Sequence, residues 1–271
     1  MTTDPMLTGE SRPPVVPDAV DVTNQPPLGH DEAMALLPVE LDRALDLVRS
    51  LDDREWAAQT ACPDWDVHRM YLHVLGACEA AASMRENVHQ MRLGRRHRAR
   101  RGGSLEAGLS NVQVRERADV TPAELVERLA AVAPRTVHKR TTTPALLRRI
   151  KMRIDAPVVE RWSLGYLIDT IYLRDLWMHR VDATRATGRD LVLTADHDGR
   201  IVADVVAEWA RRHGEPFTLS LDGPAGGVYT SPGSHSPDRP TETLELDAVE
   251  FCRTLAGRAD ASGLLTTIVP F

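Results

Sequence analysis

Apolar residues recur every three or four positions along three stretches in the first half of the chain, as one face of an α-helix requires. The first predicted helix covers residues 31–51. The second begins at residue 67, with Asp66 as its N-cap, and is expected to run past Ala82. The third begins at residues 121–124 (Thr-Pro-Ala-Glu), where Thr caps, Pro takes the first helical position and Glu returns a hydrogen bond. It is expected to end near His138.

A fourth and longer helix is predicted between Ser163, which can cap its beginning, and Gly188, which can end it. These limits allow about 24 residues, or roughly 36 Å at 1.5 Å per residue. Four long helices joined by modest connections favour an antiparallel four-helix bundle over residues 30–188.

The pattern changes after Gly188 to short apolar runs separated by turn residues, which predicts a small α+β domain over residues 189–271. Strands are expected at 191–193, 217–221, 227–230 and 243–246, and helices at 198–212 and from Asp247 to near Gly257. Residues 1–29 are polar and proline-rich, which predicts a disordered N-terminal tail. The predicted fold class is therefore α + α/β: a four-helix bundle followed by a small α+β domain.

Composition narrows the classes of protein that this chain fits. It has 271 residues and a formal net charge of −6, which argues against a protein that binds nucleic acid through its overall charge. Its longest apolar runs fall short of the ~18 residues of a membrane span, and the first 29 residues lack the apolar core of a secretory leader. We expect a cytoplasmic protein. The three cysteines, Cys62, Cys78 and Cys252, contain no CxxC pair and are interpreted as small buried apolar residues.

Five polar residues of the fourth helix lie on one stripe. Asp169, Tyr172, Asp175, His179 and Asp182 are spaced by 3, 3, 4 and 3 positions, which keeps them on one helix face. The rest of this helix is strongly apolar, so we expect the stripe to face the interior of the bundle.

Asp175 and His179 stand four residues apart, so a carboxylate and an imidazole can converge on one divalent ion. A plain Asp–His pair on a helix surface has the same spacing, and two ligands do not make a site. The second helix offers His68 in its first turn and His73 among apolar neighbours. His73 is the better third ligand, although it also fits a hydrogen-bonded core histidine.

Three motifs resemble the mycothiol-dependent maleylpyruvate isomerase family. They are Trp56…Thr60-Ala61-Cys62-Pro63-Asp64-Trp65-Asp66-Val67…His73, Asp175-Leu176-Trp177-Met178-His179-Arg180-Val181-Asp182…Arg185-Ala186-Thr187-Gly188, and the weaker Leu255-Ala256-Gly257-Arg258-Ala259. The resemblance spans residues 32–265. It implies a DinB-like N-terminal bundle and a divalent metal, usually zinc, on His73, Asp175 and His179. The family's acidic ligand is often Glu, so the shorter Asp175 implies a closer or weaker ion.

The resemblance also implies a reaction. Three protein ligands leave one position open, as in catalytic zinc sites, and in this family that position takes the thiol of mycothiol. A thiolate adding to an activated double bond can isomerise a small unsaturated acid or transfer sulfur to it. Arg258 can hold the substrate carboxylate or lie solvated in the last turn of a helix. Asp182 can orient a ligand histidine or pair with Arg185.

Two further features each allow more than one interpretation. Six arginines between residues 92 and 101 predict a solvated loop; the alternative is a positively charged rim that attracts an acidic cosubstrate. Asn111 and Gln113 are interpreted as loop residues that can also reach a cosubstrate.

The leading hypothesis is a metal- and mycothiol-dependent isomerase or S-transferase. The alternatives are a non-catalytic metal-binding or regulatory protein with an anionic partner, and a thiol-independent metal hydrolase. The small electrophilic acid and mycothiol are the expected partners, nucleic acid and membrane are not, and both monomer and dimer are compatible with the sequence.

Overall fold

The computed structural model describes residues 19–156, 159–234 and 240–271. Its first, helical part contains α1 (His30–Ser50), α2 (Asp53–Trp56), α3 (Val67–Ala82), α4 (Met84–Arg101), α5 (Leu105–Arg115), α6 (Pro122–Thr141), α7 (Ala145–Arg148), α8 (Leu164–Tyr166), the π-helical segment η2 (Leu167–Ile171) and α9 (Tyr172–Thr187). α1, α3, α6 and α9 pack together as the four-helix bundle. The predicted bundle is therefore confirmed.

The predicted helix beginnings coincide with side-chain caps. The Asp66 carboxylate accepts a 2.7 Å hydrogen bond from the Arg69 backbone N–H at the start of α3. Thr121 and Glu124 form a reciprocal capping box at the start of α6. Ser163 caps α8, and α8, η2 and α9 continue one another until Gly188, whose φ of 70° is left-handed. Glycine takes this conformation without strain, so it ends the helix.

The second part contains η3 (Ala195–Gly199), α10 (Arg200–His213), β4 (Phe217–Asp222), β5 (Gly227–Ser231), β6 (Glu242–Asp247), α11 (Ala248–Leu255) and η4 (Gly263–Thr266). With β1 (Val20–Asp21), the strands form a mixed sheet in the order β1-β5-β4-β6. β4 pairs antiparallel with β5, whereas β6 pairs parallel with β4 and β1 parallel with β5. The predicted small α+β unit is confirmed.

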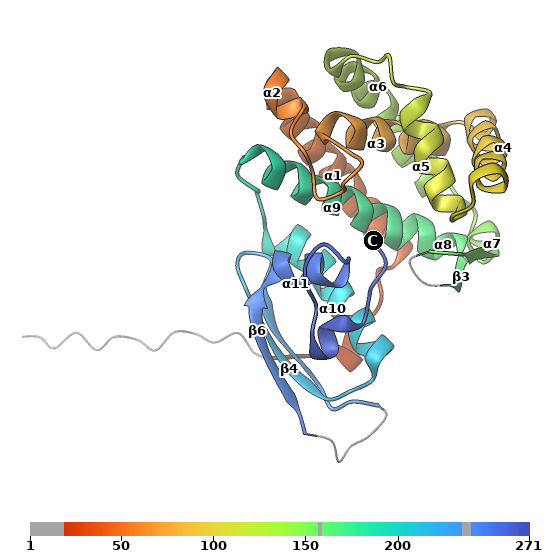
Figure 1. Cartoon of the computed structure of the whole chain (residues 1–271). Coiled ribbons are helices and arrows are strands. Elements are labelled where there is room, and N and C mark those ends of the chain that lie inside the picture. The colour runs from red at the N-terminus through yellow and green to blue at the C-terminus, as the bar shows by residue number, and fades with distance from the viewer. Residues whose placement is uncertain (1–18, 157–158, 235–239) are drawn as a thin grey trace, which may run out of the picture.

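α9 packs against two hydrophobic cores at once. Leu176 and Ala183 contribute to the core of the bundle, whereas Leu173, Trp177 and Val181 contribute to the core between the sheet and α10. Figure 1 shows α9 crossing the molecule between these two parts. The polar stripe of α9 is therefore carried by the element that joins both halves. The division into 30–188 and 189–271 stays a prediction.

Some predicted elements are wrong. Residues 191–193 have no regular structure, and the antiparallel pair β2 (Lys151–Ile154) and β3 (Glu160–Ser163) was not predicted. Residues 1–18 of the predicted disordered tail lie outside the described residues. From Val20 on, the expectation fails, because β1 pairs with β5 and the short helix η1 (Val22–Asn24) buries Val22 in the second core. Short polar runs gave no periodic signal for these contacts.

The arginine-rich stretch is the C-terminal half of α4, not a loop, and Asn111 and Gln113 lie on α5, again not in a loop. α4 and α5 pack against one another and against α3, outside the four bundle helices. Gly94 and Gly108 allow this pairing: a Cβ on Gly108 would come within 2.7 Å of the Gly94 carbonyl oxygen. Among the described residues, no helix combines the length and the apolar character needed to cross a lipid bilayer.

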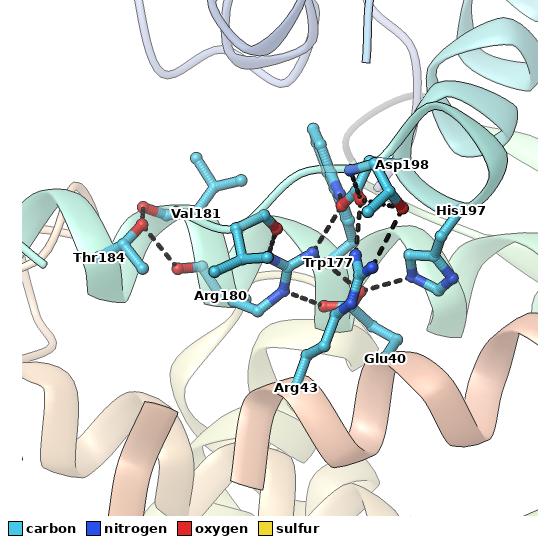
Figure 2. A network of polar contacts seen from close by, with 10 residues as sticks. Glu40, Arg43, Trp177, Arg180, Val181, Thr184, His197 and Asp198 are labelled. Atoms are coloured by element: carbon cyan, nitrogen blue, oxygen red, sulfur yellow. Dashed lines mark hydrogen bonds and ion pairs between the residues drawn. The ribbon is translucent and has the colours of Figure 1, made fainter. Parts of the chain in front are cut away.

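A buried polar network joins the bundle to the second part (Figure 2). Arg180 of α9 makes 2.7 and 3.0 Å hydrogen bonds to Glu40 of α1 and a 2.7 Å bond to Asp198 of η3. Glu40 also contacts His197 at 2.8 Å, and Asp198 accepts from Arg43 and from the indole of Trp177. Glu40, His197 and Asp198 are close enough to hold a metal ion. Because two arginines already neutralise both carboxylates, we interpret this cluster as structural.

Candidate metal centre

A closed loop before α3 places a tryptophan over the candidate site. The Gln59 side-chain amide donates to the Cys62 and Trp65 carbonyl oxygens at 2.8 and 2.9 Å, and the Thr60 hydroxyl donates to the Trp65 carbonyl at 2.7 Å. The Trp65 ring lies 5.1 Å from the His73 ring and 6.4 Å from the His179 ring, measured between centroids. The loop motif thus shapes one wall around the two histidines.

The structure brings His73, Asp175 and His179 together from α3 and α9. One ligand atom from each lies within 4.8 Å of the other two. His73 Nε2 is 3.7 Å from Asp175 Oδ2, and His179 Nε2 is 3.3 Å from Asp175 Oδ1. His68 does not take part, since its Nε2 contacts the Val120 carbonyl oxygen at 3.0 Å. The choice of His73 over His68 therefore agrees with the geometry.

Gln113 fixes the ring of His73. His73 Nδ1 lies 2.7 Å from Gln113 Oε1, while Gln113 Nε2 donates to Gln90 Oε1 at 2.9 Å. Because the amide nitrogen is committed to Gln90, its oxygen must accept from His73 Nδ1–H. The lone pair of His73 then sits on Nε2, which faces Asp175. Sequence reasoning missed this role, because residues 73 and 113 are brought together only by the packing of α5 on α3.

Asp175 is held in its charged form. Burial alone would raise the pKa of its carboxyl, but attraction to His179 and the close contacts with His179 and His73 outweigh burial and hold the pKa well below its usual range. His179 is 3% exposed, and neither of its ring nitrogens has a hydrogen-bond partner among the described residues. A buried imidazole without partners is costly unless something else occupies its lone pair.

This donor set fits a divalent metal ion. Two imidazole nitrogens and one carboxylate oxygen are ligands that zinc accepts, and His73 already has the outer hydrogen bond that ligand histidines usually make. The unsatisfied nitrogens of His179 are the observation that favours an ion over a simple ion pair.

Asp169 does not join the group. The wider turn of η2 takes it off the stripe, and it instead contacts His30 at 2.7 Å and Arg148 at 3.4 Å.

Arg258, which is partly buried, and Asp182, which is buried, form an ion pair at the other end of the stripe. Arg258 Nε donates to the two carboxylate oxygens of Asp182 at 3.1 and 2.8 Å. Both sequence-based alternatives for Asp182 are wrong. It neither contacts a ligand histidine nor pairs with Arg185, which binds Glu250 of α11 instead. The contact between Asp182 and Arg258 depends on the fold of the second part, which the local spacing on α9 does not reveal.

Cys62 of the closed loop lies near the candidate site. Burial raises the pKa of its thiol, the Arg258 guanidinium opposes this, and the Asp182 and Asp175 carboxylates add to it. The thiol is thus kept protonated, which makes Cys62 a poor nucleophile. Cys78 and Cys252 are buried, in agreement with their interpretation as apolar residues.

Replacing Gln113 with leucine is expected to weaken binding of a divalent ion by about 10–100-fold, because the ring of His73 loses its orienting partner. The measurement is a competition titration of Zn²⁺ against a chromophoric chelator. Gln113→Glu keeps an acceptor for His73 Nδ1–H and should retain most of the affinity. Asn111→Leu, on the same helix, is the matched control. Equal affinities for Gln113→Leu and Asn111→Leu would show that Gln113 does not orient a ligand.

Residues 37–184 match the family model described as the mycothiol maleylpyruvate isomerase N-terminal domain. This match covers more than half of the chain and includes His73, Asp175 and His179. The chain belongs to the mycothiol maleylpyruvate isomerase family. It therefore belongs to a family of enzymes, and the resemblance seen in its motifs is confirmed. No curated protein sequence matches the chain.

Two solved structures share the fold of this mycothiol maleylpyruvate isomerase family member. One is the crystal structure of the mycothiol-dependent maleylpyruvate isomerase, with 15% sequence identity and a TM-score of 0.55. The other is a histidine-to-alanine mutant of the mycothiol-dependent maleylpyruvate isomerase, with 16% identity and a TM-score of 0.52. Each alignment covers 89% of this chain and 92% of the other. The shared fold therefore extends beyond the bundle into the second, α+β part.

Proposed function

We propose that this protein is a metal-dependent enzyme that uses mycothiol to isomerise a small unsaturated acid of the maleylpyruvate type. The observation that carries the proposal is the convergence of His73, Asp175 and His179, with both nitrogens of the buried His179 unsatisfied. Family membership supports the thiol and the class of acid. Zinc is the proposed ion, held by these three side chains.

When bound, such an ion acidifies a thiol placed beside it, so that the thiol reacts as a thiolate at neutral pH. The protein's own groups prepare this site. Gln113 holds His73 with Nε2 toward the cluster, and the negative charge of Asp175 partly neutralises the cation. The Trp65 ring covers His73 and His179 and limits the access of water.

The proposed reaction balances without any further reagent. The thiolate sulfur adds to one carbon of the double bond, and the electron pair moves onto the conjugated carbonyl group. The former double bond is then single and can rotate. Return of the electron pair expels the thiolate and restores the double bond in the trans arrangement. In an S-transfer, a proton would trap the adduct instead.

Arg258 is the proposed group for one substrate carboxylate. Asp182 holds its Nε, so the two terminal nitrogens remain to bind a carboxylate through two parallel hydrogen bonds. Asp182 thus orients Arg258 rather than a ligand histidine.

The test is an assay of the purified protein with maleylpyruvate, with and without mycothiol. The proposal predicts cis-to-trans isomerisation only when mycothiol is present, and no net consumption of the thiol. A stoichiometric thioether product would identify an S-transferase. Turnover that is equal without thiol would contradict the proposal and favour a metal hydrolase.

A further inference from the structure

The end of α6 carries a buried arginine without a counter-ion. Arg140 is 6% exposed, and its side chain makes no ion pair and no hydrogen bond with any residue that the structure describes (19–156, 159–234 and 240–271). The other deeply buried arginines are paired, as Arg174 is with Asp204 and Arg180 with Glu40. An uncompensated buried charge is costly, because it loses its hydration. The charge of Arg140 therefore needs an explanation.

The guanidinium of Arg140 rests on an aromatic ring. Its central carbon lies 4.3 Å from the centroid of the Tyr172 ring, a cation–π contact that replaces only part of the lost hydration. Nε is fully enclosed and unbonded, whereas the two terminal nitrogens are not enclosed. A guanidinium that rests on an aromatic ring, with its two terminal nitrogens open, can bind a carboxylate through two parallel hydrogen bonds.

Arg140 stands beside the candidate metal centre. Tyr172 precedes Asp175 by three residues, so the two side chains are neighbours on one face of α9. Burial raises the pKa of the Tyr172 hydroxyl, Arg140 opposes this, and Asp175 adds to it, which agrees with all three groups being close. At the other end of the same stripe, Asp182 holds Arg258. The two helix positions that contact these arginines, Tyr172 and Asp182, lie on either side of Asp175 and His179 in the sequence, about 15 Å apart along the axis of the helix at 1.5 Å per residue.

These two arginines differ in charge balance. Asp182 neutralises Arg258, whereas no described carboxylate neutralises Arg140. A small acid with a single carboxylate would need only one such group. The acid class of the proposed function has two carboxylates, one at each end of a short unsaturated chain.

We propose that Arg140, on the platform of Tyr172, is an anion subsite that binds the second carboxylate of a dianionic unsaturated substrate. This inference rests on the proposed function for the identity of the acid, but the anion subsite itself does not require turnover. The bound carboxylate supplies the counter-ion that the fold leaves out. Arg140 is then a residue that selects dicarboxylic over monocarboxylic acids.

The test is binding of maleate, a small cis-unsaturated dicarboxylate, to the full chain without thiol, by calorimetry and by the shift in Tm. Arg140→Met is compared with Arg135→Met, an exposed position on the same helix. We expect maleate to bind the wild type and Arg135→Met alike, and to bind Arg140→Met at least about tenfold more weakly, because the charge-assisted pair is lost. The neutral diamide of maleic acid should bind none of the three proteins.

A second readout separates binding from structure. Without ligand, Arg140→Met should have a Tm equal to or above that of the wild type, because an unpaired buried charge has been removed. A clear fall in Tm would show that Arg140 serves the fold and would overturn the proposal. Maleate affinity unchanged in Arg140→Met, or no maleate binding to the wild type, would overturn it as well.

The anion subsite and the proposed function can fail independently of one another. If maleate binds through Arg140 but no thiol-dependent isomerisation occurs, the proposed function fails and the anion subsite stands. If isomerisation occurs, Arg140→Met should raise KM for the acid by at least about tenfold and leave KM for mycothiol unchanged. An equal rise in both constants would contradict a specific role for Arg140 in binding the acid.

Discussion

Replacing Arg180 with methionine is expected to lower the free energy of unfolding by about 3–5 kcal/mol. Arg180 is 3% exposed and bonds two carboxylates, Glu40 and Asp198, that are both fully buried. Without it, Glu40 keeps only His197, and Asp198 keeps Arg43 and Trp177. Urea denaturation followed by circular dichroism measures the change.

Two further variants identify the cause. Arg43→Met should cost less, because the Arg43 side chain is 21% exposed and Asp198 then retains Arg180. Glu40→Leu combined with Arg180→Met should recover part of the loss, since no unpaired carboxylate remains at position 40. A loss below about 1 kcal/mol in Arg180→Met would show that this network does not hold the two halves of the molecule together.

Replacing Asp175 with asparagine is expected to reduce thiol-dependent isomerisation by at least about 100-fold. The two side chains have nearly the same shape, so the fold should persist, but the neutral amide is a far weaker ligand than a carboxylate. Even groups that only orient a ligand account for about 10–100-fold in affinity or activity. Steady-state kinetics with saturating mycothiol gives the measurement, and circular dichroism confirms that the variant is folded.

Asp169→Asn is the matched control, because it makes the same change on the same predicted stripe. Asp169 contacts His30 and Arg148 and lies outside the cluster. We expect this variant to lose some stability and to keep its activity. If both variants were equally active, the cluster would not be the catalytic centre.

The long helices were predictable because their signals are local. Asp66, Thr121 and Gly188 act on backbone groups within a few residues, so the sequence alone is enough to place the ends of α3, α6 and α9. The pairing of Asp175 with His179 was predictable for the same reason. The choice of His73 followed from its apolar neighbours on the second helix.

What the sequence did not reveal depends on contacts between distant segments. Gln113 meets His73 only because α5 packs on α3, across 40 positions. Arg258 reaches Asp182 across 76 positions, from the second part of the molecule. The spacing puts Asp169 on the same stripe as Asp175 only if the helix is uniform, whereas the π-helical turn of η2 shifts Asp169 to other partners.

The role of Arg140 is hidden in the sequence for a different reason. In the sequence it is one cation in the last turn of a helix, where cations are common because they compensate the helix dipole. Only burial and the lack of a counter-ion mark it as unusual. Both properties are set by the elements around it, above all by Tyr172 of α9.

The most direct test of the central claim is elemental analysis of the purified wild-type protein and of His73→Ala, with His68→Ala as the control on the same helix. The metal-centre account predicts close to one equivalent of a divalent metal, with zinc the expected element, in the wild type and in His68→Ala. It predicts far less metal in a folded His73→Ala. Equal metal content in His73→Ala and the wild type would contradict it.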